Sequence, residues 1–101
     1  MVTESRSYRA SLKEVYDASV DALRKCGFEV KDRKENSIRA TSGFSLRSWG
    51  ENVEIILIHH NEGVEVRVSS LPAGQLFDWG KSYENVSRIL ADLDLRLSRR
   101  K

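Results

Sequence analysis

The chain has 101 residues, of which 40% are hydrophobic and 32% are charged, and its formal net charge is +2. This length and composition predict one folded domain over residues 1–101 and exclude a disordered chain. No apolar run approaches the roughly 20 residues of a membrane span, and no signal-peptide stretch opens the chain, so we expect a soluble, cytoplasmic protein.

The first part of the chain predicts a strand followed by a helix. Residues 5–10 are expected to form the strand. Ser11 and Glu14 match a capping box, so the helix begins at Leu12, and Gly27 suits the left-handed turn that ends it. Cys26 is the only cysteine, which excludes an internal disulfide, and we expect it to pack as a small apolar residue. The helix presents one apolar stripe, formed by Leu12, Val15, Tyr16, Ala22, Leu23 and Cys26.

Four segments in the middle of the chain alternate as antiparallel strands do. They are residues 28–30, 38–41, 52–60 and 64–68. If both helices cover the face that carries Val53 and Ile55, then Ile56 and Ile58 lie on the open face. Their neighbours there would be too polar for a second core. Ile56 and Ile58 are therefore either an isolated exposed pair or candidate interface residues for a contact with another chain, and a homodimer could form through this face or through a sheet edge.

A long helix is predicted at the carboxyl end. Residues 71–74 contain the only proline and are expected to break the sheet, and Asp78 is expected to cap a helix that runs to about residue 98. The order is β-α-β-β-β-β-α, which predicts an α+β fold with both helices on one face of an antiparallel sheet. We favour pairing of the first strand with the fifth, while pairing with the second strand remains open. The predicted seam of the helix is Trp79, Tyr83, Val86, Leu90, Leu93 and Leu97.

The sequence contains none of the common motifs for acyl transfer, nucleotide binding or zinc catalysis. His59 and His60 are adjacent in a strand, so they point to opposite faces and cannot share a metal. Cys26 lies on the buried stripe, where a thiol is a poor nucleophile. We therefore expect no enzyme activity, no catalytic residue, no metal site and no cofactor.

Two polar groups of residues are candidates for binding. Asp78, Lys81 and Asn85 lie at the amino end of the long helix, where free backbone donors attract anions, although an Asp78 cap would use one of these donors. The chain has two Trp-Gly segments, Trp49-Gly50 and Trp79-Gly80, and Trp49 and Glu51 belong to the one that leads into a strand. These five residues are the candidate binding residues of the sequence.

Five short motifs follow one another along the chain. They are Gly27-Phe28, Ile38-Arg39-Ala40, Trp49-Gly50-Glu51-Asn52-Val53, Val66-Arg67-Val68-Ser69-Ser70, and Asp78-Trp79-Gly80 with Asn85 displaced. With them, the chain from Tyr8 to about Leu95 resembles an uncharacterised bacterial and archaeal family, a domain of unknown function that also occurs in envelope proteins. The chain departs from the family pattern at residues 81–84, where the family has an asparagine soon after the glycine. The resemblance implies a fold and carries no established activity.

Three functions are compatible with these features. We predict a non-catalytic domain that binds a protein partner or a second copy of itself. The alternative is a carrier of a small molecule or lipid, with a groove between the sheet and the C-terminal helix lined by Tyr83, Val86 and Leu90. Weak nucleic-acid binding through the basic tail of residues 96–101 comes third, since the small net charge gives it little support.

Overall fold

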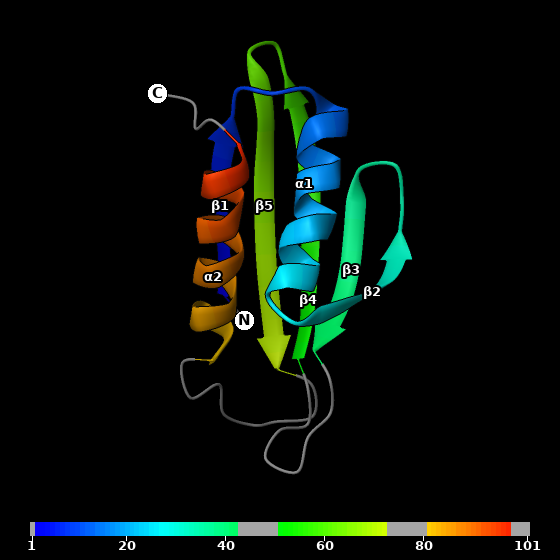
Figure 1. Ribbon diagram of the computed structural model, residues 1–101, viewed down its shortest axis with the longest axis vertical. Helices are drawn as coiled ribbons and strands as arrows, with labels where there is room; N and C mark the ends of the chain where they lie inside the picture. The colour runs from blue at the N-terminus through cyan, green and yellow to red at the C-terminus, as the bar shows by residue number, and fades with distance from the viewer. Residues whose placement is uncertain (1, 43–50, 73–80, 98–101) are drawn as a thin grey trace.

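The computed structural model describes residues 2–42, 51–72 and 81–97 (Figure 1). Its elements confirm the predicted order of strands and helices. They are β1 (Val2–Tyr8), α1 (Leu12–Lys25), β2 (Phe28–Arg33), β3 (Ser37–Ser42), β4 (Glu51–His60), β5 (Gly63–Pro72) and α2 (Lys81–Arg96).

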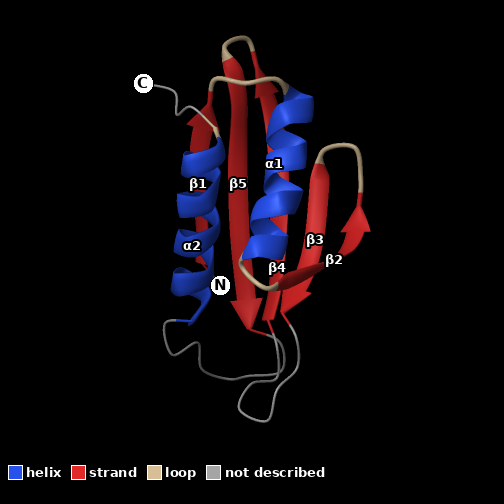
Figure 2. Cartoon of the chain, viewed as in Figure 1, coloured by secondary structure: helices blue, strands red, loops and turns tan. Residues whose placement is uncertain are grey.

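The strands form one antiparallel sheet with the order β1-β5-β4-β3-β2. The predicted pairing of the first strand with the fifth is confirmed, because Tyr8 lies opposite Val64 and Val2 opposite Ser70. Both helices lie on the same face of this sheet (Figure 2). We call the helix-covered side the inner face and the other side the open face.

The ends of α1 follow the local signals of the sequence. The Ser11 hydroxyl accepts a hydrogen bond from the Glu14 amide, and the Glu14 carboxylate accepts one from the Ser11 amide, at 3.1 and 3.3 Å. This capping box satisfies two amide groups that a helix start leaves free. Gly27 has φ +89°, the left-handed conformation that glycine adopts at little cost. The predicted start and stop of this helix are confirmed.

The core lies between the inner face and the helices. The inner-face residues of β4 and β5, among them Ile55, Val64 and Val66, are fully buried, as are Val15 and Leu23 of α1. From α2 the buried apolar residues are Val86, Ile89, Leu90 and Leu93. In the described part of the chain, no helix is long and apolar enough to cross a membrane.

Several predicted boundaries are wrong. β1 covers Val2–Tyr8 rather than residues 5–10, because it pairs along its whole length with β5. β5 continues through Leu71 to Pro72, which lies opposite Glu51. Leu71 and Pro72 therefore belong to the sheet, although the prediction placed them in a segment that breaks it. The helix α2 begins at Lys81, and the predicted Asp78 cap lies outside the described residues, as does Trp79.

The predicted seam of α2 is also partly wrong. Tyr83 is 59% exposed, whereas Ile89, which the prediction omitted, is fully buried. The core stripe runs through Val86, Ile89 and Leu93, and Tyr83 lies about 80° away from its centre at the 100° per residue of a helix. Leu95 is 87% exposed, as its position opposite the seam predicts.

A polar contact fixes α2 to the edge strand β1. The Asp94 carboxylate accepts a hydrogen bond from the buried Tyr8 hydroxyl at 2.8 Å and forms an ion pair with Arg6. The guanidinium and the phenol both donate to the same carboxylate, and such charge-assisted hydrogen bonds are stronger than neutral ones. This contact joins the carboxyl-terminal half of α2 to β1.

Candidate functional site

The open face of the sheet carries a hollow of about 390 Å³ over β2, β3, β4 and β5. We call it the open-face hollow. Its described lining residues are Lys31, Asp32, Arg39, Ala40, Thr41, Asn52, Val53, Glu54, Ser69 and Ser70. A volume of this size falls within the roughly 300–1,000 Å³ of small-molecule sites in proteins.

The strand register aligns the polar residues of the hollow in rows. Asp32 lies opposite Arg39, Arg39 opposite Glu54, and Glu54 opposite Ser69, so one polar row crosses four strands. Thr41 and Asn52 face each other in the next row. Side chains of neighbouring residues point to opposite faces of a strand. The buried residues Ala40, Val53 and Ser70 therefore contribute main chain to the floor of the hollow, and their side chains face the core.

Several polar groups of the hollow are not engaged. The Arg39 guanidinium approaches the Glu54 carboxylate only to 3.9 Å, and both side chains are largely exposed. Among the described residues, Asp32, Thr41 and Asn52 make no side-chain hydrogen bond or ion pair. Two cations, Lys31 and Arg39, and two anions, Asp32 and Glu54, line the same space, and Lys31 also forms an ion pair with Glu29 at 3.0 Å. The hollow therefore offers donors and acceptors of both charges to a ligand.

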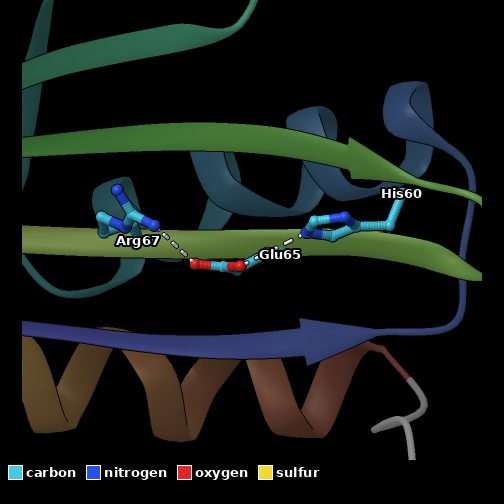
Figure 3. A network of polar contacts seen from close by, with 3 residues as sticks. All are labelled: His60, Glu65 and Arg67. Carbon is cyan, nitrogen blue, oxygen red and sulfur yellow. Dashed lines mark hydrogen bonds and ion pairs between the residues drawn. The ribbon is translucent and has the colours of Figure 1, made fainter.

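A second polar cluster lies on the open face, farther along the same strands (Figure 3). The Glu65 carboxylate lies 3.0 Å from the Arg67 guanidinium and 3.3 Å from the His60 ring nitrogen Nε2. The cluster flanks Ile56 and Ile58, which lie opposite Arg67 and Glu65 and are partly buried. The expected placement of Ile56 and Ile58 on the open face, beside polar neighbours, agrees with the register, and their role as an interface stays a prediction.

This cluster predicts a measurable shift in acidity. Hydrogen bonds from Arg67 and then His60 lower the pKa of the Glu65 carboxyl below its ordinary value. We expect Arg67→Ala to raise this pKa more than His60→Ala does, as measured by side-chain carboxyl NMR over an acid titration. Because the folded-state pKa is depressed, any stability gained is present above the unfolded pKa and lost as pH falls through the folded pKa. Equal pKa values in wild type and Arg67→Ala would contradict the assignment.

Two of the candidate binding residues meet at one end of the core. The Asn85 side-chain amide donates a hydrogen bond to the Glu51 carboxylate, and these residues are only 3% and 2% exposed. The contact joins the start of β4 to α2. Ser70 is on the same inner face, and its hydroxyl is buried without a hydrogen-bond partner in the described structure. Glu51 and Asn85 thus face the core, and their role in binding a ligand stays a prediction.

The other three candidate binding residues, Trp49, Asp78 and Lys81, cannot be assigned to a site, because their side chains are not described. Trp49 and Asp78 lie outside the described residues, and Lys81 is the first residue of α2, with its side chain undescribed. Within the described ranges, no group of three or more His, Cys, Asp and Glu side chains is arranged to hold a metal ion. Cys26 is partly buried, and this burial raises the pKa of its thiol.

Sequence reasoning missed the open-face hollow. Its residues lie on four strands that are separated along the chain, and each looks like an ordinary solvated residue of an alternating strand. The signal that could have found it is the register of β2 with β3 and of β3 with β4, which aligns Asp32, Arg39 and Glu54 across the sheet.

Comparisons with known proteins show a shared fold. No protein-family model matches the chain, and a search of curated proteins finds no significant match. The family resemblance of the sequence therefore stays a prediction. Among solved structures, the Aha1 dimer from Colwellia psychrerythraea is similar with a TM-score of 0.66 and 16% identity, over 95% of this chain and 94% of that one.

Two further structures show the same arrangement. Protein CV1439 from Chromobacterium violaceum has a TM-score of 0.57 and 12% identity, over 98% of each chain. The di-domain ARO/CYC StfQ from the steffimycin biosynthetic pathway has a TM-score of 0.57 and 12% identity; 95% of this chain aligns with 45% of that one. Identities this low establish a common α+β fold and do not transfer an activity.

Proposed function

We propose that this domain binds a small polar molecule in the open-face hollow. The observation that carries the proposal is a space of about 390 Å³ walled by Asp32, Thr41 and Asn52, whose side chains have no partner in the described part of the chain. Polar groups placed around a concavity fix the orientation of a ligand. The occurrence of this fold in a protein from the steffimycin biosynthetic pathway supports a role with small molecules.

The charge pattern of the hollow suggests the kind of ligand. Because Lys31 and Arg39 are balanced by Asp32 and Glu54, the hollow has no excess charge to attract an anion or a cation. A zwitterion or a neutral molecule with both donors and acceptors fits this pattern. Free amino acids, nucleosides and monosaccharides are the classes that meet the requirement.

The expected affinity is modest. A ligand of about 13 non-hydrogen atoms, roughly the size of a monosaccharide, is expected in a hollow of about 390 Å³, near the lower end of small-molecule sites. At about 0.3 kcal/mol per atom, such a ligand gains about 4 kcal/mol, which corresponds to a Kd of about 1 mM.

The position of the hollow differs from the groove expected under the C-terminal helix. Val86 and Leu90 are fully buried there and belong to the close-packed core, while Tyr83 faces outward. The carrier hypothesis therefore moves to the opposite face of the sheet. The prediction that the chain is not an enzyme stays a prediction.

A two-dimensional NMR titration tests the proposal. We expect members of a panel of amino acids, nucleosides and monosaccharides, added to millimolar concentration, to shift the amide signals of residues 31–32, 39–41, 52–54 and 69–70. Arg39→Ala and Asn52→Leu are expected to weaken binding at least about fivefold, a cost of about 1 kcal/mol for one lost hydrogen bond. Arg67→Ala is the matched control, since Arg67 lies on the same face outside the lining. Shifts that Arg67→Ala abolishes and Arg39→Ala leaves intact would refute this site.

Self-association is a second candidate function. The Colwellia psychrerythraea neighbour is described as a dimer, and this supports, for the present chain, the expectation of a contact with a second copy. The sequence offered the open face or a sheet edge for such a contact. The solution mass of the purified protein, measured by light scattering over a range of concentrations, distinguishes a monomer from a dimer.

A further inference from the structure

The two edges of the sheet differ in how they are protected. The edge strand β2 is interrupted by a bulge between Val30 and Asp32 and carries charged residues along its exposed end. A bulge is one of the devices that keep an edge strand from pairing with another chain. The opposite edge strand, β1, pairs with β5 over seven residues without a register shift and contains no proline. In the described structure, no strand lies along its outer side (Figure 1).

We propose that β1 pairs antiparallel with β1 of a second copy of this chain, around a two-fold axis at Ser5. This register places Val2 opposite Tyr8 and Thr3 opposite Ser7. It also places Glu4 opposite Arg6 twice, once on each side of the axis. Glu4 and Arg6 lie opposite the buried Val68 and Val66, so both occupy the inner face. Opposite charges directly across an antiparallel pair stabilise it.

The neighbouring two-fold registers are unfavourable. An axis at Glu4 would place the two Glu4 carboxylates opposite each other, and an axis at Arg6 would do the same for two guanidinium groups. Like charges in directly opposite positions destabilise a pair of strands. An axis between two residues would pair inner-face with open-face positions, so the helices of the two copies would lie on opposite sides. The charges of β1 therefore select the axis at Ser5.

Two charged side chains of β1, Glu4 and Arg6, are available for the contact. In the described chain, the partly buried Glu4 carboxylate forms no hydrogen bond or ion pair. Arg6 forms an ion pair with Asp94, and its side chain is still 31% exposed. A guanidinium has five donors, so Arg6 can serve Asp94 of its own chain and Glu4 of the second copy together. In the paired strands, the Glu4 carboxylate of each copy then lies opposite the Arg6 guanidinium of the other copy.

The helix α2 supplies a second part of the same surface. Tyr83, Ser87, Ala91 and Asp94 follow one another at helical spacings of four, four and three residues and share one side of α2. Asp94 contacts β1, so this side faces the β1 edge. The Tyr83 side chain is 59% exposed and lies on this surface.

The two copies of α2 would lie next to each other across the new pair of strands, because α2 contacts both β1 and β5. Asp94 of α2 lies beside Arg6 and Tyr8 of β1. Ser5 is about two residues earlier in β1, a distance of about 6.6 Å, and the same distance along α2 covers about four residues. The axis at Ser5 therefore passes α2 near Ala91, which is small and exposed. Two copies of Ala91 permit this close approach.

Analytical ultracentrifugation of the full chain tests the proposal. We expect the wild type to form a dimer, and Glu4→Arg to weaken it about tenfold or more, because two opposite-charge pairs become like-charge pairs. Glu29→Arg makes the same charge change on the opposite edge strand and is expected to leave the dimer intact. The Arg6→Glu variant is expected to weaken the dimer to the same extent. An equimolar mixture of Glu4→Arg and Arg6→Glu is expected to form a heterodimer, because each chain supplies the charge that the other lacks.

The controls separate folding from association. Arg6→Glu also removes the ion pair with Asp94, so circular dichroism must show that it is folded before the mixture is interpreted. If it is unfolded, Glu4→Arg against Glu29→Arg decides alone. A monomeric wild type overturns the proposal, as does a dimer that Glu4→Arg leaves unchanged. A dimer that Ile56→Asp dissociates and Glu4→Arg does not would assign the contact to the open face and also overturn it.

Discussion

Replacing Asn85 with leucine is expected to lower the free energy of unfolding by about 2–4 kcal/mol. The Glu51 carboxylate is 2% exposed, and the Asn85 amide donates a hydrogen bond to it. Loss of a donor to a buried charged group costs the desolvation of that group, about 1–3 kcal/mol or more. Urea unfolding measures the change. Ser70→Ala, at the same end of the core, is the matched control and is expected to be nearly neutral, because the Ser70 hydroxyl has no hydrogen bond to lose in the described structure.

The Asn85→Asp variant tests the same contact through pH. Two carboxyl groups in one buried site cannot both ionise readily, so the pKa of one of them is raised in the folded state. A raised folded-state pKa gives stability that is present below the unfolded pKa and is lost as pH rises through the folded pKa. We expect Asn85→Asp to lose stability between about pH 4 and 7, the range above the ordinary carboxyl pKa. A loss equal to that of Asn85→Leu at every pH would show that Asn85 acts only by packing.

Replacing Gly63 with alanine is expected to destabilise the protein by about 3 kcal/mol or more, through steric overlap and backbone strain that each cost about 1–3 kcal/mol. A Cβ atom at Gly63 would lie 2.2 Å from the backbone oxygen of Tyr8, and φ there is +156°. The backbone of Tyr8 cannot move easily, because its strand pairs with β5 beside Val64.

Gly27→Ala provides the comparison for Gly63→Ala. Gly27 also has a positive φ, of +89°, but a Cβ there would meet nothing within 4 Å. Its substitution is expected to cost only the left-handed strain of about 1–2 kcal/mol. Urea unfolding of both variants at one protein concentration measures the difference. Equal losses at the two positions would show that the close approach of Tyr8 contributes nothing.

Local signals in the sequence predicted most of the fold. The capping box at Ser11 and Glu14 and the glycine at Gly27 located both ends of α1, because these groups act within one turn of the helix. Alternation located β3, β4 and β5 to within a few residues. Pairing of the first strand with the fifth was favoured, and the structure decided it against pairing with the second strand.

The candidate site was less predictable. Glu51 and Asn85 were named separately, as members of two Trp-Gly segments, and the structure joins them across the core. Their contact depends on how α2 is placed over the sheet, which no local pattern specifies. Tyr83 was expected in the core, and its outward position follows from the rotation of α2 that buries Val86, Ile89 and Leu93.

The sequence alone thus determined the α+β class, the order of the elements and the division of β4 into a face with Val53 and Ile55 and a face with Ile56 and Ile58. These properties depend on spacings of two to four residues and on caps that act locally. Tertiary structure decided the open-face hollow, the polar row from Asp32 to Ser69 and the open edge at β1. These features depend on strand register and helix rotation, which are set by contacts between residues far apart in the chain.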